Sequence, residues 1–200
     1  MATATKPSRA GEPKQRPAGT RDAILDHAVD LASTHGLEGL TIGRLAAELE
    51  MSKSGLFGHF GSKEELQLAT IDAAARRFLA EVGPPFGEME PGAARLRAIA
   101  DAHIGYLERG VFPGGCFWVA TTTEFDSRPG PVRDALHDRV AAWQMAMEEE
   151  ARVAGADDPA QLAFEMQAIT QGANFSFQMF GDRKAFDRAR TALDRLLPQP

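Results

Sequence analysis

The sequence contains a single cysteine, Cys116, and no long uninterrupted run of apolar residues. One cysteine excludes an internal disulfide bond and is typical of proteins in a reducing cytosol. No apolar run approaches the roughly 18 residues that a membrane-spanning helix requires. The first 19 residues lack the apolar segment of a secretory signal peptide. These absences predict a cytoplasmic protein with no membrane partner.

Basic charge is also scarce, because 22 lysines and arginines face 28 aspartates and glutamates, for a net charge of −6. A broad basic surface is therefore excluded, and any affinity for DNA must come from a few placed cations. Residues 1–19 are the local exception, since Lys6, Arg9, Lys14 and Arg16 accompany only Glu12. That segment is rich in proline and glycine and lacks aromatics, which predicts a disordered basic tail.

Recognisable catalytic patterns are missing as well. The five histidines are scattered along the chain. We find no metal-ligand spacing, no phosphate-binding glycine loop and no set of nucleophile, base and orienting group. We therefore expect no catalytic residues, no metal site and no cofactor, and we interpret the chain as a protein other than an enzyme.

Helical periodicity runs from residue 20 to the C-terminal end of the chain. Apolar residues recur every three or four positions, and caps and breakers such as Thr20, Gly36 and Gly83-Pro84-Pro85 separate the segments. No segment alternates as a half-buried strand would. The pattern predicts an all-α fold of about nine helices, including a long helix at 63–82 and an unusually apolar one at 160–180.

Residues 42–66 carry the most specific signal. Two short helical patterns are separated by a tight turn, and Ser62 and Glu65 form a capping box for the next helix. This layout is typical of a helix-turn-helix, whose second helix enters the DNA major groove. We predict a three-helix DNA-binding domain at 20–66 and a second helical domain at 67–200, connected by the helix at 63–82.

The order of residues across this first domain is distinctive. It includes Ile24-Leu25, Ala28, Gly36, Thr41, Leu45-Ala46, Ser52, Leu56-Phe57, His59-Phe60 and Ser62-Lys63-Glu64-Glu65-Leu66. In this order the chain resembles the TetR family of bacterial transcriptional regulators. The resemblance implies a C-terminal domain that binds a small-molecule effector and dimerises, and the Gly115-Cys116 opening of a later helix agrees with it. Repression is the family's commoner mode of action.

Several positions depart from the family pattern. Glu50 stands where the turn often has glycine, and a non-glycine residue at positive φ costs roughly 1–2 kcal/mol, so we expect a local difference in the turn. Phe57 replaces a tyrosine whose hydroxyl reaches a DNA phosphate in the family. Gly55 and Gly58 replace larger residues in the predicted recognition helix, at a cost of about 1 kcal/mol each, and bring its backbone closer to whatever it meets.

The predicted DNA contacts gather around the two helices of this motif. Lys53 could bond guanine, contact a phosphate or stay solvated. For Lys63 we favour a phosphate contact over a solvated side chain, because a cation in the first turn of a helix is otherwise unfavourable. For Phe57 we favour a core position over contact with a thymine methyl. The predicted set is Thr41, Arg44, Ser52, Lys53, Ser54, Gly55, Phe57, His59 and Lys63, of which His59 and Lys63 match phosphate-binding positions of the family.

The basic tail offers one further hypothesis about DNA. Arg9 or Arg16 could lie in a minor groove, as the arms of some DNA-binding proteins do. An ordinary mobile basic tail explains the same residues equally well.

Aromatic and amide side chains in the second half of the sequence could line an apolar cavity. Pockets of this kind suit small apolar or aromatic ligands, although an ordinary core position is favoured for any single aromatic. The predicted ligand contacts are His103, Tyr106, Phe117, Thr121, Glu124, Trp143, Met147, Gln167, Gln171 and Phe175. Further candidates are Trp118, Thr122, Phe125, Phe164 and Asn174.

Three of the polar candidates have competing interpretations. His103 lies on an apolar stripe, so a satisfied core histidine is favoured over a ligand contact. Glu124, if buried, needs a partner, which could be an arginine or the ligand. Cys116 could be a redox sensor if the start of a helix lowered its pKa, but simple packing is the favoured reading.

The apolar helix at 160–180 must be buried on most of its faces. We therefore predict a homodimer formed through the last two helices, with an internal helix in a monomer as the alternative. Two recognition helices about 34 Å apart would then read a palindromic site on double-stranded DNA. The predicted function is a ligand-responsive regulator, most simply a repressor released by its effector, and the alternative is an architectural DNA-binding protein without an effector.

Overall fold

The structure is a computed structural model, and it describes residues 18–199. All regular structure in this range is helical, which confirms the all-α prediction. The ten helices described are α1 (Ala18–Gly39), α2 (Ile42–Glu48), α3 (Lys53–Phe60), α4 (Lys63–Val82), α5 (Pro84–Glu88), α6 (Ala93–Arg109), α7 (Phe117–Phe125), α8 (Pro131–Val153), α9 (Pro159–Phe180) and α10 (Lys184–Leu196).

The helix that the sequence pattern missed is α5. We took Gly83-Pro84-Pro85 as the end of a helix, but the prolines also begin the short α5, in which they occupy the first two positions. Proline is favoured there because its missing N–H would have no partner in the first turn anyway. The predicted basic tail and its arginines lie outside the described residues, except for Ala18 and Gly19, which already belong to α1. None of the helices described combines the length and the apolar character needed to cross a bilayer.

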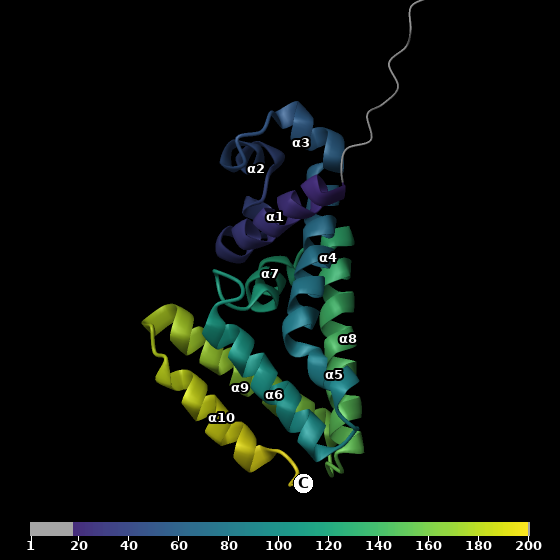
Figure 1. The fold of residues 1–200 in the computed structure, drawn as a ribbon, viewed down its shortest axis with the longest axis vertical. Helices are drawn as coiled ribbons and strands as arrows, with labels where there is room; N and C mark the ends of the chain where they lie inside the picture. The colour runs from purple at the N-terminus through teal and green to yellow at the C-terminus, as the bar shows by residue number, and fades with distance from the viewer. Residues whose placement is uncertain (1–17, 200) are drawn as a thin grey trace, which may run out of the picture.

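The first three helices form a small unit at one end of the molecule (Figure 1). Its core is made by Leu25 and Ala28 of α1, Leu45 of α2, and Leu56 and Phe60 of α3, all of them buried. Side-chain caps begin α2 and α3. Because α2 and α3 are only 7 and 8 residues long, the core that they share with α1, and not their helix propensity, holds them in place.

The long α4 runs from this unit into the other helices, where it lies beside α8 (Figure 1). It begins at Ser62, whose hydroxyl accepts a hydrogen bond from the Glu65 N–H at 3.0 Å. Leu66 and Ile71 are buried near its start, and Phe78 and Val82 near its end. The same rigid element therefore belongs to the cores of both halves, and the predicted domain boundary falls inside it.

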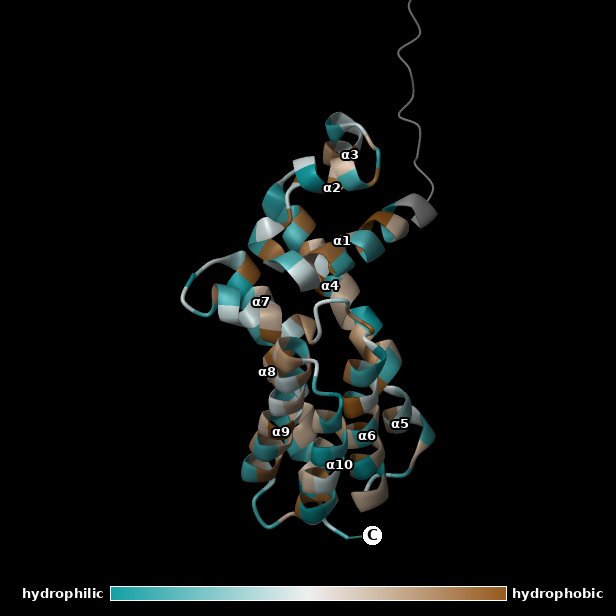
Figure 2. Ribbon diagram, turned by 90° about the vertical axis from the view of Figure 1, so that its left-hand side faces the viewer, coloured by the Kyte–Doolittle hydropathy of each residue, from teal (hydrophilic) through white to brown (hydrophobic). Residues whose placement is uncertain are grey.

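The remaining helices pack around α6, α8 and α9. Arg95 of α6 and Glu150 of α8 form a buried ion pair, with Nη2 to Oε1 at 2.6 Å and Nε to Oε2 at 2.8 Å. Helix α10 covers α6 and α9 (Figure 2). Its apolar residues Phe186 and Leu193 are buried within the chain, so this helix has little apolar surface left for a partner.

Candidate DNA-reading surface and ligand cavity

The turn between α2 and α3 keeps a left-handed residue although it lacks glycine. Glu50 has φ 51°, and it is the only non-glycine residue at positive φ in the described part of the chain. The Met51 N–H closes the turn by donating to the Ala46 carbonyl at 2.9 Å. Our expectation of a different turn is therefore wrong, because Glu50 adopts the strained conformation instead.

The N-terminal end of α3 presents small polar groups. Ser52 caps the helix by accepting a hydrogen bond from the Gly55 N–H at 3.0 Å, and the Ser54 hydroxyl lies 3.3 Å from that of Ser52. Lys53 is exposed beside Gly43 of α2, where an added Cβ would come within 3.4 Å of the lysine Cε. Ser52, Lys53 and Ser54 therefore lie together at the end of α3 that our prediction assigned to base reading.

Phe57 lies outside the core that we favoured for it. Its side chain is 54% exposed, whereas its neighbour Leu56 and the next turn's Phe60 are buried. Gly58 beside it is exposed as well. An aromatic ring on an otherwise small and polar helix face is available to a base or a thymine methyl. The structure therefore favours contact with DNA for Phe57 over the core position that we predict from the sequence.

Two of the predicted DNA-contacting cations, Lys63 and Arg44, have acidic partners within the chain. Lys63 Nζ lies 2.7 Å from Glu38 Oε1, and this hydrogen bond is the main cause of the lowered pKa of Glu38. Arg44 Nε lies 3.4 Å from Glu48 Oε1. Our argument that Lys63 needs DNA to explain its place is therefore incomplete, since Glu38 provides an internal partner. Exposed pairs of this kind are weak and exchange readily.

Thr41 and His59 occupy the flanks of the same unit. The Thr41 hydroxyl accepts from the Arg44 N–H at 3.1 Å and so caps α2. His59 is half-buried in the last turn of α3, and its ring lies 6.1 Å from that of Phe60.

The second half of the molecule encloses a cavity of about 460 Å³. This volume falls within the range of small-molecule sites. Most of the wall is apolar, and it is built from six helices and the loop ends between them. Its lining is Ala75, Phe78, Leu79, Gly83, Phe86, His103, Leu107, Cys116, Trp118, Val119, Thr122, Arg139, Val140, Ala142, Trp143, Ala146, Gln167, Thr170, Gln171 and Asn174.

The predicted ligand residues fall into two groups. His103, Trp143, Gln167 and Gln171 line the cavity, as do the further candidates Trp118, Thr122 and Asn174. The others do not. Tyr106, Phe117 and Thr121 are buried in the core, Met147 borders a separate small void, Phe175 is 56% exposed, and Glu124 is directed at α1.

These differences follow from helix geometry, because periodicity identifies one apolar face but not what that face meets. Phe117, Thr121 and Glu124 share one side of α7, and Trp118, Val119 and Thr122 lie on the side toward the cavity. The sequence analysis missed Phe78, Phe86 and Arg139. Phe78 lies on the apolar stripe of α4, as an ordinary core residue would, and Phe86 belongs to α5, which the sequence pattern did not predict.

His103 is enclosed by aromatic rings. Its ring stacks on Tyr106 at 5.5 Å between centroids and meets the edges of Phe78 and Trp143 at 5.6 and 5.5 Å. Burial lowers the pKa of His103 from 6.5 to about 4. Desolvation penalises the charged imidazolium, so the ring is neutral at pH 7.

Cys116 is buried against the same cluster. Burial raises its pKa, the opposite of the lowering that a redox role requires. Its N–H donates to the Asn174 side-chain oxygen at 2.9 Å. The packing interpretation of Cys116 therefore holds over the redox one.

Glu124 connects α7 to the C-terminal end of α1. Its two carboxylate oxygens accept from the backbone N–H groups of Leu37 at 2.8 Å and Glu38 at 3.0 Å. Both oxygens lie against Gly36, where α1 kinks with φ 75°. A Cβ added at Gly36 would lie only 2.7 Å from each of them. The partner that we expected to be an arginine or a ligand is the backbone of the first unit.

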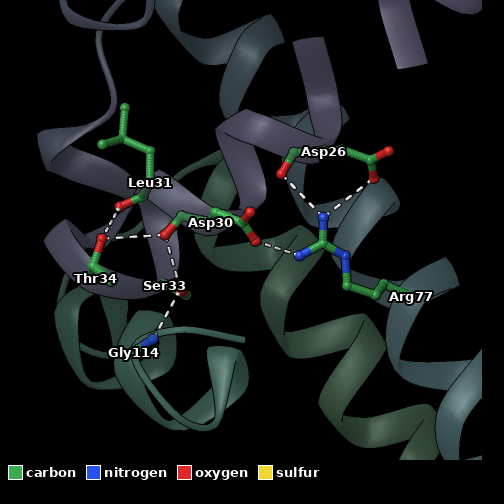
Figure 3. Close-up of polar contacts among 7 residues, drawn as sticks. All are labelled: Asp26, Asp30, Leu31, Ser33, Thr34, Arg77 and Gly114. Carbon is green, nitrogen blue, oxygen red and sulfur yellow. Dashed lines mark hydrogen bonds and ion pairs between the residues drawn. The ribbon is translucent and has the colours of Figure 1, made fainter. Parts of the chain in front are cut away.

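A second set of contacts joins α1 to α4 and to the loop before α7 (Figure 3). Arg77 of α4 bonds the carboxylates of Asp30 and Asp26 on α1, and the Gly114 N–H before α7 donates to the Ser33 hydroxyl at 3.2 Å. An added Cβ at Gly114 would lie 1.8 Å from the Ser33 carbonyl oxygen, so only glycine permits this approach. Helix α7 is thus tied to α1 at both of its ends.

A helix-turn-helix unit joined by rigid helices to an apolar cavity defines a class of one-component DNA-binding regulators. Residues 92–193 match the family model described as "Tetracyclin repressor-like, C-terminal domain". Residues 24–70 match the model described as "Bacterial regulatory proteins, tetR family". The chain belongs to the TetR family of transcriptional regulators, which are not enzymes.

Named relatives and solved structures agree with this assignment. The regulator TcmR of Streptomyces glaucescens is 32% identical over 108 residues, or 54% of this chain and 46% of the relative. The repressor AcnR of Corynebacterium glutamicum is 39% identical over 75 residues, or 38% and 39%. The chain therefore aligns with less than half the length of each. The structure of AibR in complex with isovaleryl coenzyme A and operator DNA has a similar fold, with 23% identity, TM-score 0.71, and coverage of 90% of this chain and 98% of that one.

Proposed function

We propose that this regulator binds a two-half-site operator as a homodimeric repressor and leaves it when a small apolar or aromatic molecule fills the cavity. The observation that carries the proposal is the position of α7 between cavity and DNA-binding unit. Trp118, Val119 and Thr122 border the cavity, and Glu124 on the same nine-residue helix binds α1. If a ligand displaces the cavity side of α7, the helix moves as one rigid body, and its contact with α1 of the DNA-binding unit moves with it.

The DNA contacts that we propose lie on the exposed faces of α2 and α3. Ser52, Lys53, Ser54, Gly55 and Phe57 would meet base edges in the major groove. The free N–H groups at the start of α2, beside Thr41, suit a phosphate. Arg44, His59 and Lys63 would meet the backbone of the duplex, and Lys63 would exchange Glu38 for a phosphate on binding.

The proposed dimer surface lies on α8 and α9. Along α9 an exposed stripe carries no charged residue and includes Phe164, Phe175 and Met179, with Ala168 and Gly172 between them. Small residues at its middle permit a close approach of a second helix, and Met145 extends the surface onto α8. The interface expected from the sequence paired α9 with α10, but α10 uses its apolar face inside the chain.

Repression is supported by the similarity to the repressor AcnR. A ligand that acts together with operator DNA is supported by the similar fold of AibR, whose structure is a complex with isovaleryl coenzyme A and operator DNA. The coupling follows from linkage, because a ligand shifts an equilibrium only through its different affinities for the two states. A cavity of about 460 Å³ gives such a ligand a place to bind. The same cavity disfavours the alternative of an architectural protein without an effector.

The experiment has two steps. Operator DNA is selected from a random library with the purified protein, and apolar and aromatic compounds are then screened for a raised melting temperature. A compound that stabilises the protein and releases the selected DNA supports the proposal. Selected DNA that no stabilising compound releases would leave a constitutive binder, and a failure to select any sequence would refute operator binding itself.

A further inference from the structure

His103 is the one aromatic residue of the cavity wall, within the described residues, whose side chain can both donate and accept a hydrogen bond, and it lacks a partner there. It borders the cavity from α6, deep inside the protein. Neither ring nitrogen has a hydrogen-bond partner within residues 18–199, because the ring is surrounded by Phe78, Tyr106 and Trp143. The ring is part-buried and faces the cavity, so a ligand that fills the cavity would cover its nitrogens. Covering a polar group without giving it a partner is costly, which favours a ligand that supplies one.

The other polar groups of the wall are mostly satisfied already. Thr122 donates to the Trp118 carbonyl at 2.6 Å, and Thr170 to the carbonyls of Met166 and Gln167 at 3.1 and 2.9 Å. The Asn174 side-chain oxygen accepts from the Cys116 N–H. The amides of Gln167 and Gln171 also line the cavity from α9, and Gln171 is exposed to water. His103 is the polar side chain that lies among the aromatic rings of the wall, so a hydroxyl on an aromatic ligand packed against those rings meets His103.

The charges around the cavity argue against an ionised ligand. Arg139 is the only charged residue of the lining, its side chain is half exposed, and it lies 2.7 Å from Asp72 outside the lining. No carboxylate borders the cavity to hold a cation. An anion held by Arg139 would stay beside a half-exposed side chain, and one placed deeper would have to leave water for an apolar wall, where burial of an unpaired charge is highly unfavourable.

We propose that the cavity binds an uncharged aromatic molecule bearing a hydroxyl group, and that His103 is the hydrogen-bond partner of that hydroxyl. This inference rests on the proposed function only in using the same cavity. A hydroxyl both donates and accepts, so it satisfies whichever nitrogen of the neutral imidazole faces the cavity. The rings of Phe78, Trp118, Trp143 and Phe86 supply the apolar wall against which the aromatic body packs.

The test compares probes of one shape and different polar groups: para-propylphenol, propylbenzene, para-propylanisole and para-propylbenzoate. Binding is followed by calorimetry and by the fluorescence of Trp118 and Trp143, which are the only two tryptophans of the chain and both border the cavity. We expect para-propylphenol to bind about fivefold to tenfold more tightly than propylbenzene, the typical worth of one buried hydrogen bond. The benzoate should bind most weakly.

The variant His103→Phe keeps an aromatic ring and removes both nitrogens. It should bind propylbenzene as the unaltered protein does and bind para-propylphenol no better than propylbenzene. His137→Phe is the matched control, because His137 is exposed on α8 and is not one of the residues that line the cavity. If His103→Phe lowers the melting temperature strongly, His103→Gln provides the second variant, and it should keep part of the preference for the phenol.

Three results would overturn the inference: equal binding of phenol and propylbenzene, a phenol preference that survives in His103→Phe, or tighter binding of the benzoate. Failure of all four probes to bind up to their solubility limits would also contradict it. None of these readouts uses DNA. A phenol that binds through His103 without releasing operator DNA would instead contradict the proposed function and leave the ligand class standing.

Discussion

Two single residues, His103 and Glu50, are held by the fold in states that lower its stability. His103 is held neutral in an aromatic cluster, and Glu50 is held at φ 51°. Neither property is visible from the residue type. Each depends on what the surrounding helices place around it, and each gives a measurable signature in stability.

The buried His103 predicts a loss of stability in mild acid. Its pKa is about 4 in the folded protein and near 6.5 in the unfolded chain, so the unfolded state binds more protons between these values. The part of the free energy of unfolding that depends on neutral His103 is fully present above about pH 6.5, and it is lost as the pH decreases toward 4. Tyr106 and Cys116 stay protonated throughout, because burial raises the pKa of both.

Denaturant unfolding at pH 7 and pH 5 measures this effect. The unaltered protein should lose about 2 kcal/mol more than His103→Phe over this interval, from 1.36 kcal/mol for each unit of pKa separation crossed. Parallel losses in the two proteins would mean that His103 is protonated at little cost in the folded state.

The left-handed Glu50 predicts a stabilising substitution. Glu50→Gly relieves a backbone conformation that costs non-glycine residues roughly 1–2 kcal/mol, and part of the gain is lost because glycine makes the unfolded chain more flexible. We expect the free energy of unfolding to rise by about 1 kcal/mol, measured by urea denaturation. Glu48→Gly, inside α2, should have the opposite sign, and a destabilised Glu50→Gly would contradict the φ assigned to this turn.

At the scale of whole elements, helix patterns were predictable and their surroundings were not. The capping box at Ser62 and Glu65 and the apolar stripes identified the long helices correctly. The prolines after Gly83 conceal α5, because a proline that ends one helix also suits the start of another. The two sides of α7 could not be told apart from sequence, since both are apolar or uncharged except for Glu124.

Helix α7 is predicted to transmit the signal through its contact with α1. Glu124→Ala removes the acceptor for the N–H groups of Leu37 and Glu38. We expect it to lower the free energy of unfolding by about 1–2 kcal/mol. It should also reduce the ligand-induced loss of operator affinity by about threefold or more, without changing ligand affinity.

The neighbouring Thr123→Ala is the control for this helix. Thr123 is exposed and bonds only to carbonyls of its own helix, so both quantities should remain as in the unaltered protein. Full ligand response in Glu124→Ala would assign the coupling to the other contacts with α1, those of Arg77 on α4 and of Gly114 before α7.

At the scale of the whole molecule, the exposed apolar stripe on α9 predicts self-association. Phe175 and Met179 are 56% and 63% exposed on a helix surface without charge. Phe175→Glu places two unpaired charges in the proposed interface and should shift the protein to a monomer in sedimentation analysis. Met89→Glu, on a surface loop elsewhere, should leave the dimer intact, and a monomeric unaltered protein at micromolar concentration would refute the interface.

The general function was readable from sequence because the helix-turn-helix depends on local caps, turns and core residues in a fixed order. The cavity was predicted, but its wall only in part, because it combines residues from α4 to α9 that are distant in sequence. His103, Trp143, Gln167 and Gln171 were anticipated as polar or aromatic residues on helix faces. Phe175 was misplaced, because an apolar residue exposed on a helix face has the same periodicity as one that lines a cavity.

The central claim is that occupancy of the cavity controls DNA binding through α7 and α4. Its most direct test is fluorescence anisotropy of labelled operator DNA, titrated with the protein in the absence and in the presence of a saturating cavity ligand. The account predicts that the ligand lowers operator affinity by about tenfold or more, within the usual range of coupling between two sites. Equal operator affinity with the cavity empty and filled would contradict it.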